Sequence, residues 1–135
     1  MDEKLLTGIT KVDEQHQSLV EMVEGLKVLA FKPGSEDKIM ESLEFLGTYV
    51  ASHFEYEEEL MREMNYAGYE QHYSRHVEFA EKFLASKIDA KKNGITPKLT
   101  RVLANFALDW VKEHIALEDK IMGADYMTYL ATKKN

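Results

Sequence analysis

Seven residues of this chain have the types and spacings that suit metal coordination. They comprise every histidine of the sequence and two carboxylates, namely His16, His53, Glu57, His72, His76, His114 and Asp119. His53 precedes Glu57 by four residues, and the same spacing separates the third histidine from the fourth. Residues four apart share a face of a helix, and imidazole and carboxylate groups are common metal ligands. We therefore treat these seven residues as candidate metal ligands.

Each of these signals has a simpler interpretation when it is taken alone. A histidine such as His16 can be a hydrogen-bonded core residue. A pair such as His53 and Glu57 can be a surface ion pair worth about 0.2–0.5 kcal/mol. However, all the simpler interpretations would have to be true at once. They would also have to explain why each of these polar groups occupies a position in an apolar stripe. Since buried polar groups need partners, the combined pattern favours a metal centre.

Turn-forming residues divide the chain into four segments with helical periodicity. The turns fall at residues 32–35, 65–68 and 93–97, and we expect Ser35 and the Thr96-Pro97 pair to begin helices. The histidines occupy positions of the apolar stripes. We predict an all-α fold, an up-down-up-down antiparallel four-helix bundle with an N-terminal arm and a short C-terminal helix. Residues 1–135 are expected to form one domain.

This topology would bring the candidate ligands to one end of the bundle. His16 lies near the start of the first helix and His53 in the second half of the second. His72 and His76 lie near the start of the third helix, whereas His114 lies near the end of the fourth. In an antiparallel bundle these four regions belong to the same end.

The end of the fourth helix raises a geometrical question. On an ideal α-helix Asp119 would sit about 140° around from His114, and Glu118 would be better placed. A local widening of the π type would reconcile Asp119 with the site, and such turns are frequent at functional sites. We also expect Leu117 and Ile121 to continue the apolar stripe. Gly123 is expected to close this helix before a short helix at residues 125–131. Glu58 is expected to be solvated.

The ligand count favours two metal ions. Five imidazoles and two carboxylates exceed a tetrahedral zinc site, and they lack the oxygen majority that calcium or magnesium takes. Iron, manganese, copper and zinc all accept such ligands. If both carboxylates and an oxo or hydroxo group were shared, a three-to-two division of the imidazoles would make one ion six-coordinate. The other ion would keep an open position.

Composition and charge exclude several other functions. The net charge is −7, which disfavours binding to a phosphate backbone, so we expect no nucleic-acid partner. The chain has no cysteine, which rules out disulfides and iron–sulfur clusters. It shows no signal peptide and no apolar run of roughly 18 residues, so we expect no membrane partner and a cytoplasmic protein.

In combination and order these motifs resemble those of the bacterial hemerythrins. The matching segments cover nearly the whole chain: Gly8-Ile9, residues 12–16, residues 53–58, His72 with His76, and Trp110 followed by residues 114–119. The resemblance implies a non-haem, oxo- or hydroxo-bridged centre of two iron ions. Glu57 and Asp119 would bridge, His72, His76 and His114 would bind the filled iron, and His16 and His53 the open one. Bacterial members often carry a tryptophan where this chain has Asp2.

The resemblance also implies reversible binding of dioxygen, for transport, storage or delivery, without catalysis. The alternatives are an oxygen- or redox-sensing domain of a signalling protein, and a di-iron enzyme that consumes peroxide or nitric oxide. A purely structural bundle is the remaining possibility. The sequence has no Glu-x-x-His motif, which distinguishes it from the carboxylate-rich di-iron proteins. The apolar Phe54, Val111 and Ile115 adjoin ligand positions and are expected to exclude water. An oxygen-accepting or redox protein partner is not specified by the sequence.

Overall fold

The computed structural model describes residues 3–133, and within this range the chain forms helices and no strand. The elements in chain order are a 3₁₀ turn η1 (Glu3–Leu5), α1 (Thr10–Leu29), α2 (Glu36–Glu63), α3 (Tyr69–Asn93), α4 (Pro97–His114), a π-helical turn η2 (Ile115–Asp119) and α5 (Lys120–Lys133). The predicted all-α class is confirmed.

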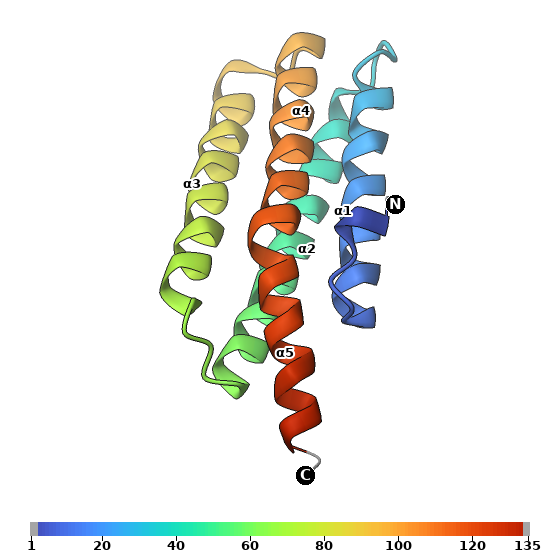
Figure 1. The fold of residues 1–135 in the computed structure, drawn as a ribbon. Helices are drawn as coiled ribbons and strands as arrows, with labels where there is room; N and C mark the ends of the chain where they lie inside the picture. Colours follow the sequence, from blue (N-terminus) through green and yellow to red (C-terminus); the bar gives the residue numbers. More distant parts are fainter. Residues whose placement is uncertain (1–2, 134–135) are drawn as a thin grey trace.

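The four long helices form the predicted bundle. α1 packs against α2 and α4, and α3 packs against the same two helices from the other side. Figure 1 shows that α5 continues α4 through η2 and extends beyond the lower end of α1. None of the helices in residues 3–133 has the length and apolar character needed to span a bilayer.

The helix boundaries follow the predicted turn chemistry at two of three places. Thr96 caps α4, since its hydroxyl accepts a hydrogen bond from the Leu99 amide at 3.0 Å, and Pro97 occupies the first turn. Gly94 ends α3 with a φ of +90°, a conformation that favours glycine. Ser35 occupies the position before α2, but its side chain makes no capping hydrogen bond.

The predicted stripe of the fourth helix is buried at Leu103 and His114, but its expected continuation to Leu117 and Ile121 is wrong. Leu117 and Ile121 are each 58% exposed, whereas Ala104 and Ala107 are buried in the core. Small side chains on this face allow the helices to approach closely. The π-helical turn then rotates the residues that follow it relative to a continuous α-helix.

Gly123 does not end a helix, because α5 runs through it to Lys133. A Cβ atom at this position would lie 2.5 Å from the carbonyl oxygen of Thr7. The N-terminal arm therefore crosses α5 at a point where only glycine fits without displacement.

Asp13 binds the N-terminal arm, residues 3–9, to the start of α1 through hydrogen bonds. Its Oδ1 accepts hydrogen bonds from the amide and the hydroxyl of Thr7, both at 2.8 Å. Its Oδ2 accepts one from the Gly8 amide at 3.3 Å. The tryptophan-to-Asp2 difference noted in the sequence lies outside the described residues.

Two hydrophobic clusters enclose the level of the histidines. The larger cluster includes Leu19, Leu43, Phe79 and Leu103, and fills the bundle toward the α1–α2 turn. The smaller one comprises Ile9, Val12, Leu60, Met61 and Met122 at the opposite end. Burying a side chain of this size contributes about 1.5–3 kcal/mol. The polar residues between these clusters are thus held in a dry layer of the core.

Candidate metal centre

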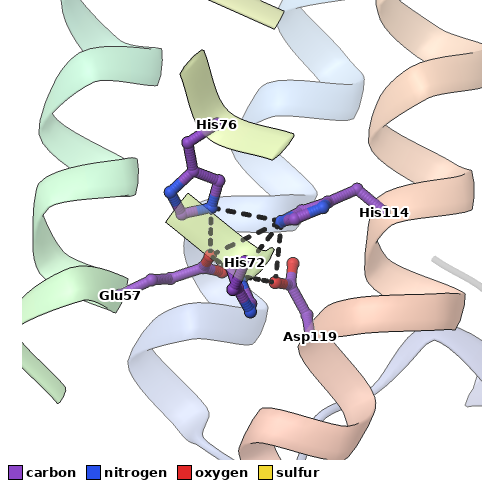
Figure 2. Close-up of side chains that lie close together, drawn as sticks. All are labelled: Glu57, His72, His76, His114 and Asp119. Carbon is purple, nitrogen blue, oxygen red and sulfur yellow. Dashed lines mark hydrogen bonds and ion pairs between the residues drawn. The ribbon is translucent and has the colours of Figure 1, made fainter. Parts of the chain in front are cut away.

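All seven candidate ligands lie together in that layer, and each is buried. His16 comes from α1, His53 and Glu57 from α2, His72 and His76 from α3, His114 from the end of α4, and Asp119 from η2. Figure 2 shows five of them, whose side chains point toward one another from three directions. The prediction that an antiparallel bundle brings them to one level is confirmed.

The π-helical turn explains how Asp119 reaches the site. The Lys120 amide donates to the carbonyl of Ile115, five residues earlier, as a π turn requires. Asp119 Oδ1 consequently lies 3.1 Å from His114 Nε2. Glu118 points outward instead, since its side chain is 18% exposed and lies 3.8 Å from the guanidinium of Arg75. The expected widening of the helix is therefore present.

The donor atoms form two groups that share both carboxylates. One group contains His72, His76 and His114, the other His16 and His53, and each includes Glu57 and Asp119. The donor atoms within each group lie within 4.8 Å of one another. The imidazoles are therefore divided three to two.

Each carboxylate directs one oxygen to each group. Glu57 Oε1 lies 3.0 Å from His76 and 3.1 Å from His72, and its Oε2 lies 3.1 Å from His53. Asp119 Oδ1 lies 3.0 Å from His72, and its Oδ2 lies 3.0 Å from His16. This is the arrangement that two bridging carboxylates require.

The spacing of the donor nitrogens is short enough for several of them to bind one metal ion. Adjacent nitrogens bound at about 2.1 Å would lie about 3.0 Å apart around an octahedral ion and about 3.4 Å apart around a tetrahedral one. His76 Nε2 and His114 Nε2 are 3.1 Å apart, and His114 Nε2 and His72 Nε2 are 3.2 Å apart. The first distance is nearer the octahedral value, and the second lies midway between the two values.

Hydrogen bonding alone does not account for these contacts. An imidazole nitrogen offers either one proton or one lone pair, yet His76 Nε2 lies close to both Glu57 Oε1 and His114 Nε2. Both oxygens of Asp119 approach imidazole nitrogens but have no hydrogen-bond geometry with any of them. Buried donors that converge without satisfying one another fit bound cations.

Two further residues, which the sequence analysis did not assign to the site, orient the imidazoles. His53 Nδ1 lies 2.7 Å from the Gln15 side-chain oxygen, and His76 Nδ1 lies 2.8 Å from Glu58 Oε2. Because these oxygens accept hydrogen bonds, each Nδ1 donates and each Nε2 is left with a lone pair facing the centre. The expectation that Glu58 is solvated is wrong. Glu58 stands in a run of glutamates, and no sequence signal distinguishes it from its exposed neighbour Glu59.

Aromatic rings stack on two of the candidate ligands, His76 and His114. The Phe54 ring stacks on His76 with centroids 3.9 Å apart and an interplanar angle of 4°. Trp110 stacks on His114 with centroids 4.5 Å apart and an angle of 17°. These contacts limit the rotation of both imidazoles and help to keep water from the nitrogens.

The two carboxylates attract positive charge to the imidazoles. Burial alone lowers the pKa of His16, but the close carboxylates of Asp119 and Glu57 outweigh it and raise this pKa from 6.5 to about 9. The pKa of His72 rises to about 9 for the same reasons. Burial raises the pKa of Glu57, yet the neighbouring histidines, above all His53, hold it well below its usual value. Protons and metal ions therefore compete for the same imidazole nitrogens.

A family model described as the hemerythrin HHE cation binding domain matches residues 7–125. The chain belongs to the hemerythrin family. All seven buried ligand candidates fall within the matched range, which makes this a hemerythrin-type metal-binding domain.

The hemerythrin relatives span nearly the full length of this chain. A bacteriohemerythrin from Clostridium acetobutylicum is 30% identical over 119 residues, which cover 84% of this chain and 89% of that protein. A bacteriohemerythrin from Methylococcus capsulatus is 27% identical and covers 87% of each. The crystal structure of a wild-type hemerythrin superposes with a TM-score of 0.79 at 27% identity, over 89% of this chain and 90% of the other.

Proposed function

We propose that this hemerythrin-family chain binds dioxygen reversibly at a non-haem di-iron centre. In this proposal His72, His76 and His114 hold one iron, His16 and His53 hold the other, and Glu57 and Asp119 bridge them. The supporting observation is the three-to-two division of imidazoles between two groups that share both carboxylates. With equal contributions from the bridges, the two-imidazole position has one protein ligand fewer, and a small molecule can bind there.

The chemistry of the ligands supports iron. Zinc accepts imidazoles and carboxylates but has no redox chemistry. Two ferrous ions would supply the two electrons that dioxygen binding requires. The mixture of imidazole and carboxylate among the candidate ligands also suits iron.

The balance of charge supports binding in preference to substrate oxidation. The site offers five neutral imidazoles and only two carboxylates as candidate ligands. Fewer anionic ligands give less stabilisation to highly oxidised iron, which substrate-oxidising centres need. The absence of a Glu-x-x-His motif from the sequence agrees with this difference.

The residues around the site favour slow autoxidation of an oxygen-bound ferrous centre. Phe54, Val111 and Ile115 are all buried, as the sequence predicted. Their side chains carry no polar atom that would hold a water molecule beside the candidate ligands. We therefore infer that these residues protect the ferrous state by excluding water.

An oxygenation cycle tests the proposed function. The iron-loaded chain should develop an oxygen-dependent charge-transfer absorption, lose it when oxygen is removed, and regain it over several cycles. Sustained oxygen or peroxide consumption in the presence of a reductant would instead indicate an enzyme. An iron-loaded protein whose spectrum ignores oxygen would contradict the proposal.

Ile115→Glu tests the exclusion of water. Ile115 is fully buried next to His114, whereas Ile121 is 58% exposed and provides a matched control. A carboxylate at residue 115 should admit water and raise the autoxidation rate by at least tenfold, and Ile121→Glu should leave it unchanged. Ile115→Ala, which opens space without adding charge, should give an intermediate rate. Equal rates in all the proteins would refute the protective role.

A further inference from the structure

The two imidazole groups differ in the residues that form hydrogen bonds with the Nδ1 atoms, on the side of each ring away from the centre. In the two-imidazole group, His53 Nδ1 donates to a neutral amide oxygen of Gln15 at 2.7 Å. In the three-imidazole group, His76 Nδ1 donates to a carboxylate oxygen of Glu58 at 2.8 Å. The Nδ1 atoms of His16, His72 and His114 are buried and have no hydrogen-bond partner within the described residues. Each group therefore has one outer hydrogen bond, and only one of these bonds is charged.

The difference in charge has an electronic consequence. A carboxylate attracts the Nδ1 proton more strongly than an amide does, which gives the imidazole more anionic character at Nε2. A more anionic ligand stabilises the higher charge of an oxidised metal ion. In Figure 2 one nitrogen of His76 faces the other candidate ligands, and its second nitrogen points away from them. This second nitrogen, Nδ1, makes the hydrogen bond to Glu58.

The location of Glu58 strengthens this effect. Its side chain is only 15% exposed and His76 is 2% exposed, so water screens the pair weakly. The stacked Phe54 ring, 3.9 Å from His76, covers one face of the imidazole and keeps it aligned. Glu58 is therefore held in a place from which its charge acts on one metal position more than on the other.

We propose that Glu58 and Gln15 make the two metal positions unequal toward oxidation, so that the first electron leaves the three-imidazole position. This inference rests on the proposed di-iron function and deepens it. With iron bound, His72, His76 and His114 would hold the ion that gives up one electron first to an added oxidant such as ferricyanide, which would become ferrocyanide. The ion held by His16 and His53 would give up the second electron at a higher potential, and Glu58 would act through its hydrogen bond to His76 Nδ1.

Two charge-exchanging variants test this assignment. Glu58→Gln keeps a hydrogen-bond acceptor but removes the charge, and should raise the potential of the first oxidation step. Gln15→Glu adds a charge at the other group and should lower the potential of the second step. Each variant should therefore reduce the difference between the two oxidation potentials. Glu58→Gln should do so by raising the first potential, and Gln15→Glu by lowering the second. The double variant should place the first oxidation at the two-imidazole position.

The measurement is an anaerobic redox titration of the iron-loaded chain with ferricyanide and dithionite, followed by electron paramagnetic resonance. In the parent, a half-oxidised sample should show a strong mixed-valence signal, and each single variant should show several-fold less of it. Iron content and thermal melting, recorded in parallel, show that each variant still folds and holds two ions.

The outcomes separate this inference from the proposed function. If Glu58 and Gln15 only position the rings, Glu58→Gln and Gln15→Glu will leave both potentials unchanged, and the inference fails. Potentials that shift in the same direction in both variants would also overturn it. If Glu58→Gln raises the first potential and Gln15→Glu lowers the second, but the parent chain does not bind oxygen, the inference is supported and the oxygen-binding function is refuted. A parent chain that holds fewer than two irons would overturn both.

Discussion

Asp119→Asn removes one bridging charge from the proposed centre while it preserves the shape of the side chain. Asp119 is fully buried, and its oxygens lie 3.0–3.1 Å from the Nε2 atoms of His16, His72 and His114. Removing one member of a buried charged set costs about 3–5 kcal/mol. Because each 1.4 kcal/mol is a factor of ten, the affinity for ferrous ions should fall roughly 100- to 5,000-fold.

Glu118→Gln provides a control one residue away. Within residues 3–133 Glu118 forms one ion pair, at 3.8 Å with the guanidinium of Arg75, whose side chain is 50% exposed. A surface pair of this kind contributes about 0–1 kcal/mol, so the affinity for iron should change by less than about fivefold.

An anaerobic titration of both variants against a chromophoric iron chelator measures these affinities directly. The thermal melting temperature with and without iron provides an independent readout, since tight binding to the folded state raises it. The reasoning fails if Asp119→Asn keeps both irons within about tenfold of the parent affinity. It also fails if Glu118→Gln loses them.

Three further results follow from the same structure. Iron binding at pH 7 should release at least about two protons per chain, because the pKa values of His16 and His72 are raised to about 9 and that of His114 is also raised, and calorimetry in buffers of different ionisation enthalpy measures this number. In the metal-free chain the protonated His16 and His72 stabilise the fold fully below about pH 6.5, and this contribution is lost as the pH rises through about 9. The urea concentration at the midpoint of unfolding should therefore fall between these pH values. A midpoint that does not change with pH would contradict the raised pKa values. Gly123→Ala should lower the stability by about 1–2 kcal/mol because the new Cβ meets Thr7, whereas Gly25→Ala, at an open helical position, should raise it by about 0.5–1 kcal/mol, and thermal melting of both variants decides.

The bundle and the site residues could be predicted because their signals repeat along the chain. Each of the first three helices carries its histidines in a stripe that the structure buries, for example Val12, His16 and Leu19 in α1. The antiparallel topology then fixes the level at which the stripes meet. The π turn could be anticipated because the family resemblance assigns Asp119 to the site, whereas a regular α-helix would place Glu118 beside His114.

The parts that could not be predicted depend on contacts between distant segments. Gly123 has the composition signal of a helix end, but its role is to accommodate the backbone of Thr7, more than a hundred residues earlier. Leu117 and Ile121 follow helical periodicity, yet the π turn changes the face on which they lie. Glu58 resembles its solvated neighbours in sequence, and only the fold shows that it binds His76.

The central claim is that seven side chains hold two irons in two unequal positions. A crystal structure of the iron-loaded chain, with anomalous data collected on both sides of the iron absorption edge, tests it most directly. The account predicts two iron peaks, one bounded by His72, His76 and His114 and the other by His16 and His53, with Glu57 and Asp119 contacting both. A single peak, a metal other than iron, or a peak that leaves out either carboxylate would contradict it.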